Sequence, residues 1–150
     1  MWNAKKSIVL SYVVCVVVLL LIVLACLLAP FYLSEFFGIM NIGENSIKYN
    51  TFMWCLYPCS FFGGVAVLSL IAMLKRIWKE HPFCRQNVIS LKIISICCFC
   101  VSLITFVGSF YCRMFIFIAA AAGFFGIILR VVKNVIQKAT ELQNENDLTI

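Results

Sequence analysis

The fold of this chain is decided by residues Ile8–Tyr32, which read IVLSYVVCVVVLLLIVLACLLAPFY and include no charged residue. At a rise of ~1.5 Å per residue, a helix of this length crosses a hydrocarbon core about 30 Å thick with some tilt. Lys5 and Lys6 precede the run, as basic residues precede the core of a signal peptide. That core is only about 7–15 residues long, however. The stretch therefore predicts an uncleaved membrane-spanning helix.

The rest of the chain continues this apolar character. Hydrophobic residues make up 64% of the sequence and charged residues 12%, whereas a soluble domain has about 45–50% and about 25%. Since about 20 apolar residues suffice for one crossing, the sequence predicts an all-α, integral membrane four-helix bundle that forms a single domain. The expected spans are residues 8–32, 51–74, 93–110 and 114–132.

The distribution of basic residues predicts the orientation of these spans. Ten of the twelve lie at one end of the expected spans, and only Lys48 and Arg113 lie at the other. Because Lys and Arg are retained on the cytoplasmic side, we expect both termini, the loop 75–92 and the tail 133–150 in the cytoplasm. The loop 34–50 is then external. This pattern explains the net charge of +6 without a basic face for nucleic acid, so we expect no direct nucleic-acid binding.

The nine cysteines do not have the spacing of a metal site. Zinc sites pair their ligands as in C-x-x-C motifs, whereas the cysteines at 97, 98 and 100 point to different sides of one helix. We expect no metal and no cofactor. A disulfide between Cys112 and either Cys55 or Cys59 is geometrically conceivable in an oxidising exterior, and the sequence leaves it open.

The expected spans also lack the groups that catalysis requires. They contain no acidic residue and no histidine, and intramembrane ionisable groups of this kind usually mark a proton or ion path. A hydrolase or transferase needs a positioned acid, base, nucleophile or metal. We therefore expect neither an enzyme nor a coupled transporter.

Small residues recur at four-residue spacing in two of the spans, at Ala119 and Gly123, at Ala122 and Gly126, and at Ser60 and Gly64. This spacing lets helices approach closely in lipid. Packing within the chain and formation of a homo-oligomer both remain open.

The segments expected in the cytoplasm carry a resemblance to a known family. Its residues are His81, Pro82, Phe83, Asn87, Val88 and Leu91 in the loop, and the ending Glu145, Asn146, Asp147, Leu148, Thr149 and Ile150. With the order of spans, they resemble domain-of-unknown-function family 2975, a group of bacterial membrane proteins. The resemblance implies a four-span protein of the bacterial cytoplasmic membrane, in a family often encoded beside a small helix-turn-helix transcription regulator.

Two functions follow as hypotheses. The first is a regulatory or interaction protein that signals to a cytoplasmic partner, such as that regulator, through Pro82, Phe83, Asn87, Leu91 and the ending at 145–150. The second is a small transport or self-immunity protein that binds a lipid or an antimicrobial peptide. An apolar end on a polar tail also allows a third arrangement, in which Leu148 and Ile150 fold back onto the Phe83 loop.

Overall fold

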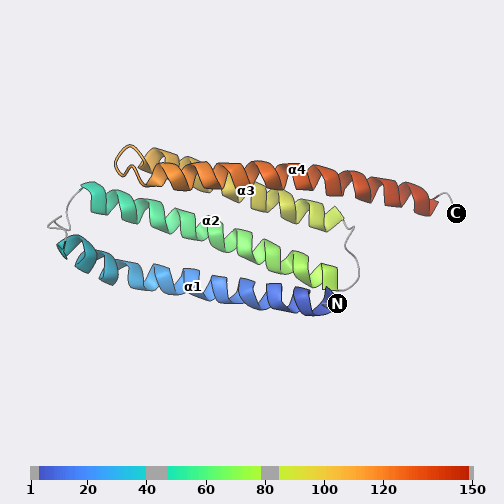
Figure 1. The fold of residues 1–150 in the computed structure, drawn as a ribbon, viewed down its shortest axis with the longest axis horizontal. Coiled ribbons are helices and arrows are strands. Elements are labelled where there is room, and N and C mark those ends of the chain that lie inside the picture. Colours follow the sequence, from blue (N-terminus) through green and yellow to red (C-terminus); the bar gives the residue numbers. More distant parts are fainter. Residues whose placement is uncertain (1–3, 40–46, 79–84, 149–150) are drawn as a thin grey trace.

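The computed structural model describes residues 4–39, 47–78 and 85–148 (Figure 1). Within them the chain forms four helices and no strand. The helices are α1 (Ala4–Ile39), α2 (Ile47–Trp78), α3 (Arg85–Gly108) and α4 (Phe115–Leu148). All four are long and apolar enough to cross a membrane. The predicted all-α, four-helix membrane fold is confirmed.

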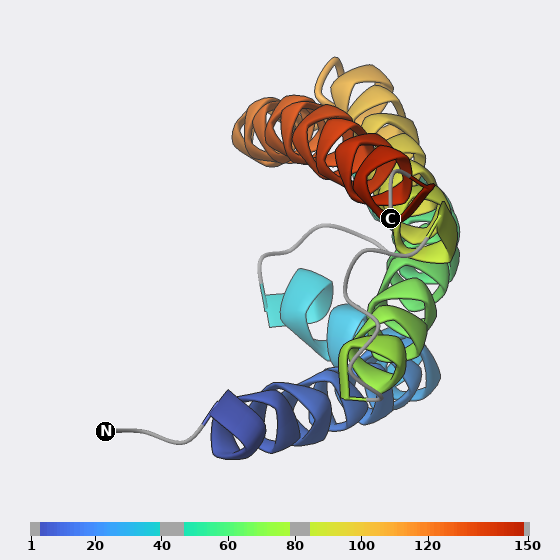
Figure 2. The same cartoon turned by 90° about the vertical axis from the view of Figure 1, so that its right-hand side faces the viewer.

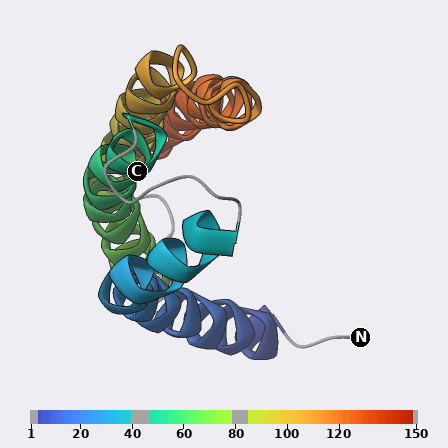
Figure 3. The same cartoon turned by 90° about the vertical axis from the view of Figure 1, so that its left-hand side faces the viewer.

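The four helices lie side by side in chain order and form an open arc (Figures 1, 2 and 3). Among the described residues, close backbone approach occurs only between consecutive helices. The helices α1 and α4 therefore form the two ends of the arc and do not close it into a ring. Both α2 and α3 have a neighbour on each side, and α3 contains most of the buried residues.

The helix array has two ends along the helix axes, and at one of them α1 begins, α2 ends, α3 begins and α4 ends (Figure 1). Basic residues gather at this end, which we call the basic end, and we call the other the hairpin end. The basic residues described in this half of the helices are Lys5, Lys6, Lys75, Arg76, Arg85, Lys92, Arg130, Lys133 and Lys138. Lys79 lies outside the described residues, and Lys48 and Arg113 lie at the hairpin end.

Small residues and hydroxyl groups join α3 to α4. The Ser95 hydroxyl donates to the Gly126 carbonyl at 2.8 Å, and the Ser102 hydroxyl donates to the Ala119 carbonyl at 2.8 Å. A Cβ added to Gly126 would lie 3.3 Å from the Phe99 ring. The absence of a side chain lets α3 approach the backbone of α4, so this small-residue face of α4 packs within the chain.

The helices extend further than the apolar runs predict. Since α1 continues to Ile39 and α2 begins at Ile47, much of the loop expected at 34–50 is helical. The loop expected at 75–92 is likewise helical as far as Trp78 and again from Arg85. A helix that leaves the hydrocarbon keeps its peptide groups hydrogen-bonded, so hydropathy does not mark its end.

The end of α4 also lies beyond the last apolar run. Asn and Asp at residues 144–147 favour turns or caps, but α4 runs to Leu148. Asn and Asp cost a helix no more than about 0.7 kcal/mol each, and neither Gly nor Pro occurs between residues 133 and 148. At the other end of the pair, α3 stops at Gly108, two residues before the expected end of the third span. The Cys112 amide donates to the Gly108 carbonyl at 3.0 Å in the tight turn that follows.

Candidate functional site

A pocket with both polar and apolar walls opens between α3 and α4 at the basic end, and we call it the α3/α4 pocket. Its volume is about 490 Å³. It is lined by Arg85, Val88, Ile89 and Lys92 from α3 and by Lys133, Gln137, Thr140 and Glu141 from α4. Each set has the three- and four-residue spacing of one helix face. Two such faces meeting at the pocket bring three basic side chains together.

Hydrogen bonds organise the α4 wall of this pocket. The Gln137 amide donates to Glu141 Oε1 at 3.1 Å, and Lys133 Nζ donates to Asn134 Oδ1 at 3.1 Å. The Thr140 hydroxyl, in a residue only 7% exposed, donates to the Ile136 carbonyl at 2.8 Å. The carboxylate and one ammonium group therefore have partners on their own helix.

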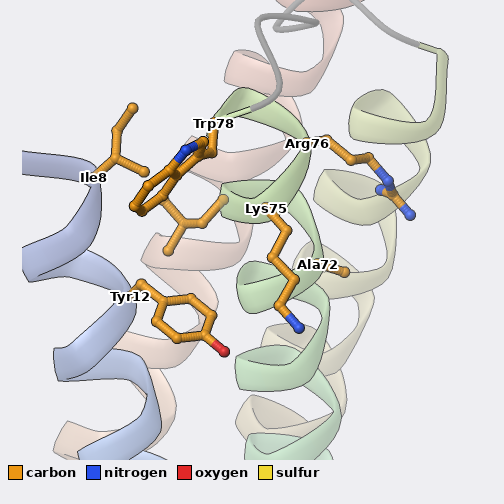
Figure 4. Close-up of a pocket in the computed structure, with 7 residues that line it drawn as sticks. Ile8, Tyr12, Ala72, Lys75, Arg76 and Trp78 are labelled. Atoms are coloured by element: carbon orange, nitrogen blue, oxygen red, sulfur yellow. The ribbon is translucent and has the colours of Figure 1, made fainter. Parts of the chain in front are cut away.

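A second pocket, of about 520 Å³, lies between α1 and α2 at the basic end (Figure 4). Its lining is mostly apolar and consists of Ile8, Tyr12, Ala72, Leu74, Lys75, Arg76 and Trp78. Lys75 Nζ lies 5.7 Å from the centroid of the Tyr12 ring, a cation–π distance. The two side chains reach toward each other across the gap, while Arg76 points toward α3 (Figure 4). This contact helps to hold α1 against α2.

Arg76 connects α2 to α3 at the basic end. Its Nη1 atom donates to the Ser90 hydroxyl at 3.0 Å and to the Gln86 carbonyl at 3.3 Å. The Ser90 hydroxyl donates in turn to the Gln86 carbonyl at 3.1 Å. Ser90 is only 5% exposed. This network therefore places the Arg76 guanidinium against a buried part of α3, the helix that also contributes Arg85 and Lys92 to the pocket.

Two of the loop residues predicted to bind a partner are buried in the helix array. Asn87 is 1% exposed and Leu91 is 4% exposed, and both belong to α3. Pro82 and Phe83 lie outside the described residues. Asn87 and Leu91 therefore pack within this chain and do not form an open surface.

The predicted C-terminal site is part of α4. Glu145 and Asn146 are exposed on its last turns, and Asp147 and Leu148 belong to the same helix. This part of the tail extends α4 past the start of α3 (Figure 1). Thr149, Ile150 and the Phe83 loop lie outside the described residues, as does the fold-back of the tail onto that loop.

The α3/α4 pocket is not predicted by the sequence. Its only sequence signal is the helical spacing of Arg85 with Lys92 and of Lys133 with Gln137. That spacing defines two faces but does not show that they meet. The meeting depends on the register set by the Ser95 and Ser102 hydrogen bonds to α4.

The thiol groups of the described chain are unpaired. Cys55, Cys59 and Cys112 are free, as are the other cysteines that the structure describes, so the disulfide left open by the sequence is not formed. No group of three His, Cys, Asp or Glu side chains among these residues is placed to hold a metal ion.

The long apolar helices, antiparallel and joined by short connections, define a multi-pass membrane protein. The chain belongs to the family described as "Protein of unknown function (DUF2975)", which it matches over residues 3–150. This match confirms the family inferred from the sequence. No curated protein and no solved structure matches the chain.

Proposed function

We propose that the protein is a regulatory or interaction protein of the bacterial cytoplasmic membrane, and that the end of α4 binds a soluble cytoplasmic partner. A small helix-turn-helix transcription regulator is the partner implied by the family resemblance. In this proposal the bundle responds to a membrane or external state, and α4 transmits that state to the partner.

The distribution of charge supports a cytoplasmic basic end. The basic residues described near this end outnumber the two at the hairpin end, Lys48 and Arg113. In the inverted orientation, all the basic residues at the basic end would have to cross the membrane, which the positive-inside rule disfavours. The start of α1 and the end of α4 then both face the cytoplasm, where a soluble partner has access to them.

The length of α4 is the observation that carries the proposal. A helix of 34 residues is about 51 Å long, and the hydrocarbon core takes only about 30 Å of it. Starting from Phe115 at the hairpin end, ~20 Å of α4 extends beyond the core at the basic end. No crossing requires this extension.

The extension has apolar side chains that its own chain leaves uncovered. Leu142 is 65% exposed and Val135 is 63% exposed, whereas Thr140, on another face of the helix, is buried. Val135 and Leu142 are seven residues apart and so share a face. Leu142 lies beyond the hydrocarbon, where an apolar side chain gains free energy if a partner covers it.

The proposal is tested by measuring binding between the purified full-length protein in detergent and the helix-turn-helix protein encoded nearest to its gene. Leu142→Glu places a charge in the expected contact and should weaken binding at least about tenfold. Deletion of residues 145–150 should also weaken it. Gln143→Glu is the matched control, because it adds the same charge at a neighbouring exposed position on another face.

Transcription of the neighbouring genes should change in cells that carry Leu142→Glu and not in cells that carry Gln143→Glu. If both substitutions and the deletion leave binding and transcription unchanged, α4 is not the contact and the proposal fails.

A second candidate function rests on a cavity of about 320 Å³ on the inner side of the arc. All four helices line it, with Ile22, Phe52, Cys55, Leu56, Cys59, Ser60, Gly63, Val101, Thr105, Phe115 and Ile118. Its apolar walls suit an acyl chain or the apolar face of an antimicrobial peptide, as a transport or self-immunity protein requires.

Survival of a deletion strain under membrane-active peptides tests this second candidate. Complementation with Gly63→Leu, which narrows the cavity beside Ile22, should fail to restore survival. Complementation with Gly64→Leu, where nothing lies within 4 Å, should restore it. Unaltered sensitivity of the deletion strain would exclude the candidate.

A further inference from the structure

The α3/α4 pocket lies at the level of one membrane surface. Lys92 is ~24 Å of helix from Gly108, and Lys133 is ~27 Å from Phe115. With the turn that joins these two helices at one face of a core about 30 Å thick, both ammonium groups reach the headgroups of the other face. Arg85, at ~35 Å from Gly108, lies among those headgroups.

The pocket carries an excess of positive charge. Arg85, Lys92 and Lys133 line it together with a single carboxylate, that of Glu141. Glu141 already accepts a hydrogen bond from Gln137 at 3.1 Å. Lys133 uses one donor on Asn134 and retains two others, while Arg85 and Lys92 are exposed. These groups favour an anionic ligand with several acceptor oxygens.

One wall of the pocket is apolar, which bears on the kind of anion. Val88 is 9% exposed and Ile89 is 50% exposed, and both line the pocket between Arg85 and Lys92 along α3. A free inorganic anion has no apolar surface to place against such a wall. A phospholipid suits the pocket, because its phosphate meets the basic groups while its glycerol backbone lies against the isoleucine at the same depth.

We infer that the α3/α4 pocket binds the phosphate group of an anionic phospholipid such as phosphatidylglycerol, held by Arg85, Lys92 and Lys133. Basic pockets between membrane helices at the cytoplasmic surface are suited to such headgroups. The bound lipid contacts both α3 and α4 and so bridges these two helices. This inference requires only that the basic end lie at a membrane surface, and it does not rest on the proposed partner.

The experiment uses native mass spectrometry of the full-length protein in detergent, with phosphatidylglycerol or phosphatidylcholine of the same acyl chains added at increasing concentration. One phosphatidylglycerol molecule should be retained in preference to phosphatidylcholine. Lys92→Gln and Lys133→Gln should each weaken its binding about fivefold. Lys138→Gln is the matched control, because it removes the same charge from an exposed position of α4 outside the pocket.

Glu141→Gln tests the inference in the opposite direction, because impaired folding would weaken lipid binding and could not strengthen it. Removing the one carboxylate from the lining should strengthen phosphatidylglycerol binding about two- to fivefold. A parallel titration with inorganic phosphate distinguishes the two sources of the anion. Phosphate at millimolar concentration should leave the bound lipid in place.

Three results would overturn the inference. The first is equal retention of the two lipids. The second is an equal loss of binding with Lys92→Gln, Lys133→Gln and Lys138→Gln, which would indicate diffuse surface charge. The third is complete displacement of the lipid by inorganic phosphate, which would assign the pocket to the free anion.

Discussion

Arg76 of α2 donates a hydrogen bond to the Ser90 hydroxyl of α3 over 3.0 Å, next to a second bond of 3.3 Å to the Gln86 carbonyl. Ser90 is 5% exposed, so an always-charged guanidinium is satisfied at the edge of the buried core. This relationship connects the α1–α2 half of the arc to the α3–α4 half at the basic end.

Ser90→Ala should lower the free energy of unfolding by about 1.5–3 kcal/mol, because it removes a hydrogen bond to a charged group. The measurement is an SDS titration of the detergent-solubilised protein followed by circular dichroism. Ser11→Ala, at an exposed position of α1, makes the same chemical change and should alter stability by less than about 0.5 kcal/mol. Equal effects of the two substitutions would show that the Arg76 bond contributes nothing.

Gly126→Ile should destabilise the protein by about 1–3 kcal/mol through overpacking. A Cβ added at this position would lie 3.3 Å from Phe99 and 3.4 Å from Cys98, and the larger side chain should force α4 away from α3. The same titration measures the effect, with the rate of proteolysis as a second readout.

Gly64→Ile is the matched control for this prediction, because no atom lies within 4 Å of a Cβ at Gly64. It should be neutral or slightly stabilising, since a central helical glycine costs about 0.5–1 kcal/mol relative to Ala. Destabilisation by Gly64→Ile equal to that of Gly126→Ile would mean that the close approach of α3 to α4 does not distinguish these glycines.

Gly108→Ala and Cys55→Ala should be energetically coupled. A Cβ at Gly108 would lie 2.7 Å from Cys55 Sγ and 3.1 Å from the Phe115 ring, so the single substitution forces a shift of both neighbours. Removing the thiol relieves the nearer contact. A double-mutant cycle should give a favourable coupling of about 0.5–3 kcal/mol. Strict additivity would contradict the contact between Cys55 and Gly108.

Cys112, in the turn at the hairpin end, should react from outside the cell with a membrane-impermeant maleimide. It is a free thiol of intermediate exposure, and the proposed orientation places it externally. A cysteine introduced by Lys138→Cys at the exposed basic end should react only after the membrane is permeabilised. Peptide mass spectrometry identifies the labelled residues, and the reverse pattern would show the inverted topology.

Much of the architecture follows from the sequence alone. The uncharged run at 8–32 and the three apolar runs after it predict four membrane helices, because transfer of apolar surface out of water adds up along the chain and needs no knowledge of neighbours. Because the number of crossings is even, the start of the first helix and the end of the fourth lie on the same side of the membrane. The family resemblance, carried by the ending at 145–150, is likewise a property of the sequence and is confirmed over residues 3–150.

The helix boundaries were predicted less well, as α1 and α4 show. Hydropathy detects the hydrocarbon core, but Ile39 and Leu148 lie in helices that continue beyond their apolar runs. There the backbone is satisfied by its own hydrogen bonds, a condition that leaves no mark on hydropathy.

Only the tertiary structure decided which faces meet. Asn87 and Leu91 look like residues of an open loop, yet the packing of α2 and α4 on either side of α3 buries them. The pocket of Arg85, Lys92 and Lys133 arises from the register of two helices, set where Ser95 and Ser102 reach the backbone of α4. Lipid is as apolar as these side chains, so helix pairing depends on close fit and hydrogen bonds, which are properties of surfaces in contact and not of either helix alone.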